Sequence, residues 1–251
     1  MARRVVDRQM LKLIKMWLQA PIEERDEQGR RCLTGGKSSR TGTPQGGVLS
    51  PLLANIYMHR YLRYWQRQGK SEQFRAKVIN YADDFVILSH AHAPEALAWT
   101  RQVMTKLKLM LNETKTCIRD ARQESFDFLG YTFGPTCYRK TGGRYYAAQP
   151  SAQSVRRLKE KLHAVFQRGN VAPWPEGAAQ ANRLLRGWAN YFGYGTLRKA
   201  YRAIDNYTYE RVVRFWKKRR QVSSRGTEQF PGEIVFGELG VQRLRSLAYG
   251  D

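Results

Sequence analysis

The sequence has few cysteines, few histidines and no long apolar run. Its three cysteines (Cys32, Cys117 and Cys137) are odd in number and far apart, with no C-x-x-C pair, which argues against a disulfide scaffold and a zinc site. The four histidines show no metal-ligand spacing. No run approaches the roughly 20 apolar residues of a membrane-spanning helix. We therefore expect a protein without a membrane span that works in a reducing, cytoplasmic compartment.

Acidic residues are scarce relative to basic ones. The 251 residues contain 44 Lys and Arg against 21 Asp and Glu, a formal net charge of +23. The excess is spread along the chain, because 25 basic and 13 acidic residues lie up to Pro150, and 19 and 8 follow it. Such an even excess favours contact with an extended polyanion, which indicates nucleic acid. A basic protein of the ribosomal kind is the alternative, and it has the same class of partner.

The hydrophobic periodicity changes near Pro150. Before it, helical and strand patterns alternate, and after it apolar residues recur at helical spacing. The first part predicts helices over 6–19, 50–64 and 94–111, a loop or short hairpin over 21–42, a strand–turn–strand over 77–89, and strands over 125–133 and 144–148. Ser50 and Pro51 are expected to open the second of these helices, with the serine as N-cap. In the second part, residues 170–177 (NVAPWPEG) are expected to separate two helices.

Two adjacent aspartates, Asp83 and Asp84, lie at the expected turn between two apolar strands. Neighbouring strand residues point to opposite faces, so the two carboxylates converge only at a turn or bulge. Both strands are expected to be buried, and unpaired carboxylates near a core are costly. A divalent cation such as magnesium removes that cost. A plain hairpin turn, in which Asp is common, is the alternative.

Five sequence blocks follow one another along the chain. They are TPQGGVLSPLLANIY at 43–57, YADD at 81–84, LNETKT at 111–116, FDFLGYTF at 126–133 and RLLRGWANYF at 183–192. Together they closely resemble the reverse transcriptases of group II introns, and the last block is similar to the maturase region of that family. The resemblance implies an RNA-directed DNA polymerase, a nucleotidyltransferase, that also acts in intron RNA splicing. It implies an α+β fold, with a partial right-hand polymerase fingers and palm (an antiparallel sheet with helices) over 1–150 and an α-helical thumb and maturase region over 151–251.

The resemblance also assigns roles to individual residues. It makes Asp83 the principal ligand and Asp84 the helper for two catalytic Mg²⁺ ions, and it places Lys115 at the departing pyrophosphate. The residues matched to the incoming nucleotide are Gln45, Gly46, Tyr81 and Ala82. The residues matched to the primer grip are Phe128, Leu129 and Gly130. A solvated role for Lys115 and simple core packing for the primer-grip residues stay open.

Basic and aromatic residues alternate in the maturase-like region. Guanidinium groups pair with phosphate and rings stack on unpaired bases, so the pattern suits RNA. The residues expected to bind RNA are Arg183, Arg186, Arg198, Lys199, Arg211, Arg214, Lys217, Lys218, Arg219 and Arg220. The interleaved rings are those of Trp188, Tyr191, Tyr194, Tyr201 and Tyr207, and their largely helical spacing favours a core position for several. The basic residues from Arg211 to Arg220 are the densest cluster, and we expect them to contact phosphate.

One carboxylate of the two-metal site has no candidate in this sequence. In the family a further aspartate comes from an earlier strand, in an apolar–Asp–apolar pattern before two aromatic residues, and no such segment precedes Asp83. Asp7 lies on an amphipathic helical pattern and Asp26 in a polar stretch. We therefore expect a chain that resembles the family without its fingers and first palm strand, with Met1 as an internal methionine.

Two alternatives to an active polymerase stay open. The chain could be a non-catalytic, RNA-binding splicing maturase or a decayed retroelement fragment. The absent aspartate favours these for the isolated chain, whereas the intact YADD and TPQGG blocks favour descent from a working polymerase. The partners implied are group II intron RNA, an RNA template with a DNA primer, deoxynucleoside triphosphates and a missing N-terminal part, in an intracellular ribonucleoprotein without a membrane.

Overall fold

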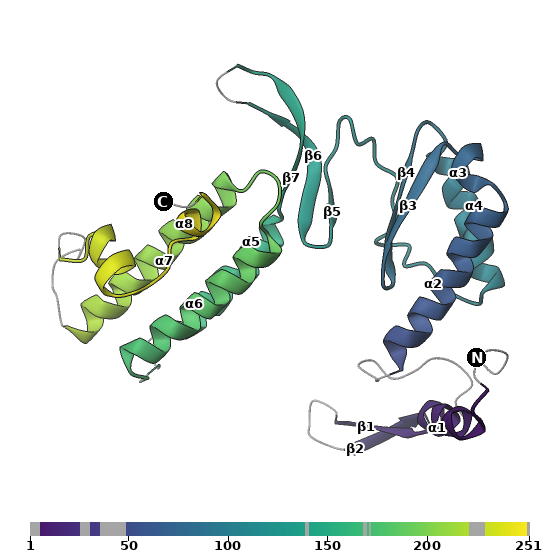
Figure 1. Cartoon of the computed structure of the whole chain (residues 1–251), viewed down its shortest axis with the longest axis horizontal. Coiled ribbons are helices and arrows are strands. Elements are labelled where there is room, and N and C mark those ends of the chain that lie inside the picture. Colours follow the sequence, from purple (N-terminus) through teal and green to yellow (C-terminus); the bar gives the residue numbers. More distant parts are fainter. Residues whose placement is uncertain are drawn as a thin grey trace. The chain divides into compact units, whose positions relative to one another are not determined.

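The structure of the chain is a computed structural model. It describes residues 6–25, 31–35, 49–138, 141–167, 170, 172–220 and 229–249 (Figure 1). The chain divides into two compact units, Met1–Ile118 and Arg119–Asp251. Each unit combines helices with small antiparallel sheets, which is the mixture that an α+β fold requires.

The first unit begins with a capped helix and a hairpin. Its described elements are α1 (Arg8–Leu18), β1 (Pro21–Arg25), β2 (Arg31–Gly35), α2 (Ser50–Arg67), α3 (Lys70–Gln73), β3 (Ala76–Tyr81), β4 (Asp84–Ser89) and α4 (Ala93–Lys106). The Asp7 carboxylate starts α1 by accepting the backbone N–H of Gln9 at 2.7 Å. β1 pairs with β2 and β3 with β4, both antiparallel. The predicted helix, hairpin and strand–turn–strand are therefore present.

The core of the first unit forms between α2, α4 and one face of the β3–β4 hairpin. Tyr61 of α2 is fully buried, and its ring lies 5.5 Å from Phe85 of β4 and 5.9 Å from Trp99 of α4. Its hydroxyl shares a hydrogen bond of 3.0 Å with that of Thr100, and burial raises the pKa of Tyr61 to about 12. One aromatic side chain thus ties the hairpin to both helices.

The other face of the β3–β4 hairpin is open. Ile79 and Leu88 are 42% and 45% exposed. The helices cover only the face that carries Val78, Phe85 and Ile87, since side chains alternate between the two faces of a strand. The expectation that both strands are buried is therefore wrong for one face.

The second unit joins a three-stranded sheet to a group of helices. Its described elements are β5 (Phe126–Phe128), β6 (Tyr131–Cys137), β7 (Arg144–Pro150), α5 (Ala152–Val165), α6 (Trp174–Tyr191), α7 (Arg198–Arg219), the π-helix η1 (Ile234–Glu238) and α8 (Leu244–Tyr249). The strand order is β5–β6–β7. α5, α6 and α7 enclose a core with the C-terminal elements η1 and α8 (Figure 1), centred on Leu162, Leu185, Ile204 and Val235.

Several predicted boundaries differ from the structure. The strand expected over 125–133 is two strands, because a tight turn at Leu129 and Gly130 reverses the chain. α4 ends at Lys106 rather than at residue 111, and Lys108 has a left-handed φ of 58° that no helix continues. α6 begins inside 170–177, at Trp174, since a proline fits the first helical turn. The N-cap of α2 is Leu49, one residue before the predicted N-cap Ser50, and the helix continues to Arg67 rather than ending at residue 64.

A buried carboxylate on α7 holds the C-terminal helix in place. Asp205 is 2% exposed and accepts the backbone N–H of Leu244 at 2.7 Å and the Nε–H of Arg245 at 3.0 Å. The negative charge thereby satisfies free amides at the start of α8 and pairs with a half-exposed guanidinium. This role was not found from the sequence.

Asp205→Ala is expected to lower the free energy of unfolding of the second unit by about 2–3 kcal/mol. The variant loses two charge-assisted hydrogen bonds and leaves the Leu244 amide without its acceptor. Urea denaturation followed by circular dichroism measures the change. Glu210→Ala on the same helix is the control, because its exposed pair with Arg214 at 3.9 Å contributes at most about 0.5 kcal/mol. Equal effects of both substitutions would contradict the role given to Asp205.

Candidate functional site

The YADD block forms the turn between β3 and β4. Tyr81 pairs with Asp84, so Ala82 and Asp83 are the two turn residues. Ala82 has a left-handed φ of 53°, which is costly for a residue with a Cβ. The Asn80 side chain stabilises this conformation by donating to the carbonyl oxygens of Ala82 at 2.9 Å and Asp84 at 3.3 Å. The sequence did not reveal that Asn80 braces the turn.

Both aspartates are exposed at the tip of this hairpin, on a turn that also exposes Tyr81. The expected desolvation cost of two carboxylates near a core is therefore absent in the described structure. Carboxylate oxygens suit magnesium. Asp83 and Asp84 fit part of such a site, but no three His, Cys, Asp or Glu side chains among the described residues gather as a metal-binding group.

Lys115 lies in a turn that is anchored to α4. The Asn112 side chain accepts the backbone N–H of Thr114 at 3.2 Å and of Lys115 at 3.3 Å. Arg101 of α4 binds Glu113 at 2.6 Å, and this hydrogen bond lowers the pKa of the Glu113 carboxyl. The Lys115 side chain is exposed, and within the described part of the chain it forms no hydrogen bond or ion pair with the YADD turn.

Gln45 and Gly46, the other two residues matched to the incoming nucleotide, lie outside the described residues.

The primer-grip candidates form a second tight turn, between β5 and β6. Leu129 and Gly130 have φ values of 51° and 77°, and Phe128 pairs with Tyr131 across them. The Gly130 carbonyl accepts the backbone N–H of Ser151 at 2.8 Å. A Cβ at Gly130 would lie 2.9 Å from the Ser154 hydroxyl oxygen and 3.1 Å from the Phe192 ring, so only glycine fits without a shift.

Two tyrosines fasten this turn to α6 by reciprocal hydrogen bonds. The Tyr131 hydroxyl donates to the Tyr191 carbonyl at 2.9 Å, and the Tyr191 hydroxyl donates to the Leu129 carbonyl at 3.0 Å. The primer-grip candidates and the maturase-like block at 183–192 therefore meet within one compact unit. Sequence reasoning missed this contact because 60 residues separate the two tyrosines.

The predicted RNA-binding residues lie on α6, at the start of α7 and near the end of α7. Arg183 and Arg186 are exposed on α6, and Arg198 and Lys199 are exposed at the start of α7. Of the interleaved rings, Tyr201 is buried in the core, Trp188 and Tyr207 pack against that core, and Tyr191 and Tyr194 are exposed. The sequence therefore correctly predicted a mixture of core and surface rings, but could not assign them.

Near the end of α7 the basic side chains lie over aromatic rings. The guanidinium of Arg219 lies 4.7 Å from the Phe215 ring centre, and that of Arg220 lies 5.0 Å from Trp216. Arg219 also donates to the Ala172 carbonyl at 3.0 Å. The remaining basic residues of this cluster are Arg211, which lies over Tyr207, Arg214, which pairs with Glu210, and Lys217 and Lys218. Packed stems of this kind hold positive charge at a fixed place on the surface.

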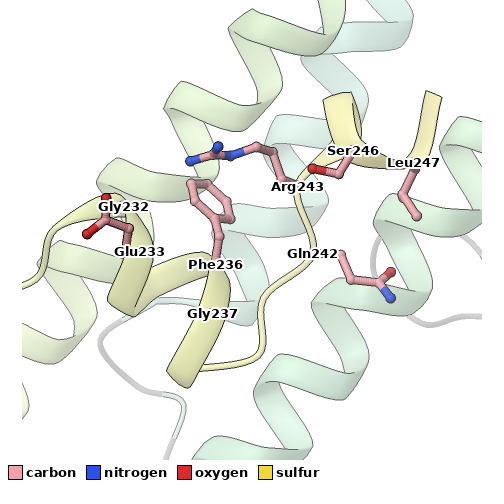
Figure 2. A pocket seen from close by; sticks show the side chains of 8 residues that line it. All are labelled: Gly232, Glu233, Phe236, Gly237, Gln242, Arg243, Ser246 and Leu247. Carbon is pink, nitrogen blue, oxygen red and sulfur yellow. The ribbon is translucent and has the colours of Figure 1, made fainter. Parts of the chain in front are cut away.

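A cavity of about 510 Å³ lies between η1 and α8 (Figure 2). Glu233 and Arg243 bring opposite charges to its lining, and the Arg243 guanidinium lies 4.5 Å from the Phe236 ring. None of the site residues predicted from the sequence lines this cavity.

Among the described helices, none combines the length and the apolar character of a membrane span.

Comparison with known families gives two matches in chain order. The reverse transcriptase (RNA-dependent DNA polymerase) family model matches residues 2–133, which is more than half of the chain. The group II intron maturase-specific domain model matches residues 155–229. The first match contains the YADD and primer-grip turns, and the second contains most of α5, the whole of α6 and α7.

Curated proteins give a consistent picture. The group II intron-encoded protein LtrA of Lactococcus lactis subsp. cremoris is 27% identical over 153 residues, covering 36% of this chain and 25% of LtrA. Protein YkfC of Escherichia coli (strain K12) is 34% identical over 126 residues, covering 38% of this chain and 33% of that protein. An uncharacterized 91 kDa protein in the cob intron of Schizosaccharomyces pombe is 23% identical over 224 residues, covering 61% of this chain and 28% of that protein. The chain thus spans about a quarter to a third of the length of these relatives.

Proposed function

We propose that the chain acts in RNA-directed DNA synthesis and in splicing of a group II intron RNA. It belongs to the reverse transcriptase (RNA-dependent DNA polymerase) family, and it also carries a group II intron maturase-specific domain. The observation that carries the proposal is the ordered pair of family matches, at 2–133 and 155–229, which flank Pro150. We accordingly assign residues 1–150 to a partial polymerase fingers and palm and 151–251 to the thumb and maturase region.

In the polymerase role, Asp83 and Asp84 supply two carboxylates for Mg²⁺. Ions held by these carboxylates would stabilise the negative charge that develops in phosphoryl transfer. The exposed tip of the β3–β4 hairpin supports this role, because its carboxylates are open to a metal and to substrate. Tyr81 and Ala82 next to them, together with Gln45 and Gly46, are assigned to the incoming deoxynucleoside triphosphate, and Lys115 to the departing pyrophosphate.

The primer-grip role falls to Phe128, Leu129 and Gly130. Their turn is held on one side by the start of α5 and on the other by the hydrogen bonds that join Tyr131 and Leu129 to Tyr191 of α6. It therefore presents a fixed backbone to the end of a DNA primer. In the splicing role, the exposed basic residues of α6 and α7 bind the phosphates of the intron RNA. The working form would be an intracellular ribonucleoprotein of the chain with its intron RNA.

A splicing maturase without polymerase activity is the second candidate. The family matches do not favour it over the polymerase; it stays open because no residue before Asp83 in the sequence matches the further aspartate of the family. It requires the same RNA surface in the second unit. The two candidates therefore share a splicing test and differ in a polymerase test.

The splicing test uses the group II intron RNA of the transcript that encodes the chain. At a magnesium concentration where the RNA alone splices slowly, the chain is expected to raise the splicing rate. Replacing both Arg183 and Arg186 by Ala is expected to raise the protein concentration required at least tenfold, because charge-assisted contacts to phosphate are lost. Replacing both Asp83 and Asp84 by Ala is the control and leaves splicing unchanged. A rate equal to that of the RNA alone would contradict the proposed splicing function.

A further inference from the structure

One face of the β5–β6–β7 sheet carries exposed aromatic side chains. Of the exposed large hydrophobic side chains described in the second unit, five are tyrosines and one is a leucine. Tyr146 pairs with Pro135, which lies an even number of residues from Tyr131, so Tyr146 and Tyr131 share a face. Tyr145 pairs with Thr136 and points to the opposite face.

The end of α6 and the loop after it add two tyrosines beside this face. The ring centre of Tyr191 lies 6.3 Å from that of Tyr131, and the Tyr194 backbone lies next to the Tyr131 hydroxyl. The backbone N–H of Thr196 donates to the Ala148 carbonyl at 2.7 Å, which keeps the loop along the edge of β7. Tyr191 and Tyr194 are nevertheless 57% and 76% exposed. We refer to Tyr131, Tyr146, Tyr191 and Tyr194 as the tyrosine face.

The loop that carries Tyr194 is in close contact with β7. A Cβ on Gly195 would collide with the Ala148 carbonyl oxygen, and Gly195 has a left-handed φ of 84°, so only glycine allows this approach. Tyr191 is likewise fixed, because its hydroxyl is bonded to the Leu129 carbonyl while its ring stays exposed. Rings held in position before a ligand arrives lose little conformational entropy on binding. The rings of Tyr131 and Tyr191 are thus held before a ligand arrives, and the backbone that carries Tyr194 is fixed against β7.

The segments that supply the tyrosine face and its flanks are basic. Residues 128–150 and 186–203 contain seven Lys or Arg and no Asp or Glu. Asp127 of β5 pairs with Thr132 and therefore lies on the opposite face of the sheet from Tyr131. Arg144 at the start of β7 and Arg198 and Lys199 at the start of α7 are exposed. Partial burial raises the pKa of the Tyr131 and Tyr146 hydroxyls above the ordinary value. Tyrosine hydroxyls are in any case neutral at physiological pH, because their ordinary pKa is about 10, and so they do not repel phosphate. Exposed rings on a face flanked by basic side chains match a polyanion with accessible bases.

We propose that the tyrosine face binds unpaired nucleotides of the intron RNA by stacking, while the neighbouring basic side chains contact their phosphates. This stacking proposal rests on the proposed splicing function, and it specifies that the tyrosine face recognises unpaired segments of the intron RNA. Double-stranded RNA is excluded from such stacking because its bases are covered by their neighbours. Tyr131 pairs with Pro150, which lies four residues after Tyr146 on β7. The two tyrosines are therefore roughly 13 Å apart along the strand, which is enough for more than one base.

Equilibrium binding of the full chain to a 2-aminopurine-labelled single-stranded RNA tests the proposal. Tyr146→Ala and Tyr194→Ala are each expected to weaken binding about tenfold, since each removes one stacking ring. The log–log salt slope stays unchanged, because no phosphate contact is lost. Tyr146→Phe and Tyr194→Phe keep the ring and are expected to bind like the wild type. Tyr145→Ala, an exposed neighbour on the opposite face, is the matched control and has no effect.

Other outcomes distinguish a failure of the tyrosine face from a failure of the proposed splicing function. If Tyr146→Ala binds the single-stranded RNA as tightly as Tyr145→Ala, the tyrosine face does not bind RNA and the proposal is wrong. An equal loss for a duplex of the same sequence, or a loss confined to the corresponding single-stranded DNA, would also overturn the assignment to unpaired RNA. A wild-type chain that binds no RNA at all would instead contradict the proposed splicing function. Circular dichroism melting of each variant shows that the fold is retained.

Discussion

A polypeptide of these 251 residues, purified alone, is expected to extend a DNA primer on an RNA template little or not at all. Magnesium at a two-metal site contributes several kcal/mol of transition-state stabilisation, so an incomplete ligand set lowers the rate by roughly 10³-fold or more. The described residues place Asp83 and Asp84 at one exposed turn without a third ligand group. Incorporation of labelled deoxynucleotides at several magnesium concentrations measures the rate.

A polypeptide that also supplies the further carboxylate is expected to extend the primer. In that protein Asp83→Asn abolishes extension, whereas Glu72→Gln on α3 leaves it unchanged, because Glu72 is an exposed carboxylate outside the YADD turn. Robust extension by the 251-residue chain alone, lost on Asp83→Asn, would show that the described pair is sufficient and that no further carboxylate is required.

Local patterns were enough to predict most elements. The strand–turn–strand over 77–89 is confirmed as β3 and β4, because apolar β-formers flank a short polar turn. Helices α1 and α5 follow their apolar periodicity, and Asp7 and Ser151 cap them with side-chain hydrogen bonds. Family membership was predictable as well, since it depends on short blocks of sequence in a fixed order and not on contacts.

Turns with left-handed residues were harder to predict. Leu129 looks like a strand residue, yet its φ of 51° with Gly130 reverses the chain and divides one expected strand into two. The degree of burial was also beyond local reasoning. Ile79 and Leu88 have the composition of a buried strand but lie on the face that α2 and α4 leave uncovered. A pattern of apolar residues does not state how many faces of a sheet are covered.

Contacts between distant residues were not predictable from one sequence. Asp205 reads as one more polar residue of a helix, and its role appears only when residues 244 and 245 fold back onto α7. The hydrogen bonds from Tyr131 to the Tyr191 carbonyl and from Tyr191 to the Leu129 carbonyl join two blocks that the family resemblance treats as separate functions. The opposite faces of Tyr145 and Tyr146 follow from alternation, but which face meets the helices depends on the fold.

Intron RNA binding is expected to lose much of its salt dependence when Lys217, Lys218, Arg219 and Arg220 are replaced by Ala. Each phosphate contact releases counterions and contributes roughly 0.7–0.9 to the log–log salt slope, so four contacts shrink the slope by about 3–4 units. Arg219 and Arg220 also cover Phe215 and Trp216, and their loss disturbs packing as well as charge. Replacing only Lys217 and Lys218 avoids this, and is expected to shrink the slope by about 1.5–2 units.

The most direct test of the chain as an intron RNA-binding protein is one filter-binding titration at several salt concentrations. It compares the wild type, the Lys217/Lys218 double-alanine variant, the Lys106/Lys108 double-alanine variant as a charge-matched control from the first unit, and the Asp83/Asp84 double-alanine variant. All four proteins are expected to bind strongly and in a salt-dependent way. Only the Lys217/Lys218 variant is expected to have a smaller log–log salt slope. The Asp83/Asp84 variant loses negative charge and is expected to bind with unchanged or slightly higher affinity. An unchanged slope for Lys217/Lys218, or binding of the wild type that does not depend on salt, would contradict this prediction.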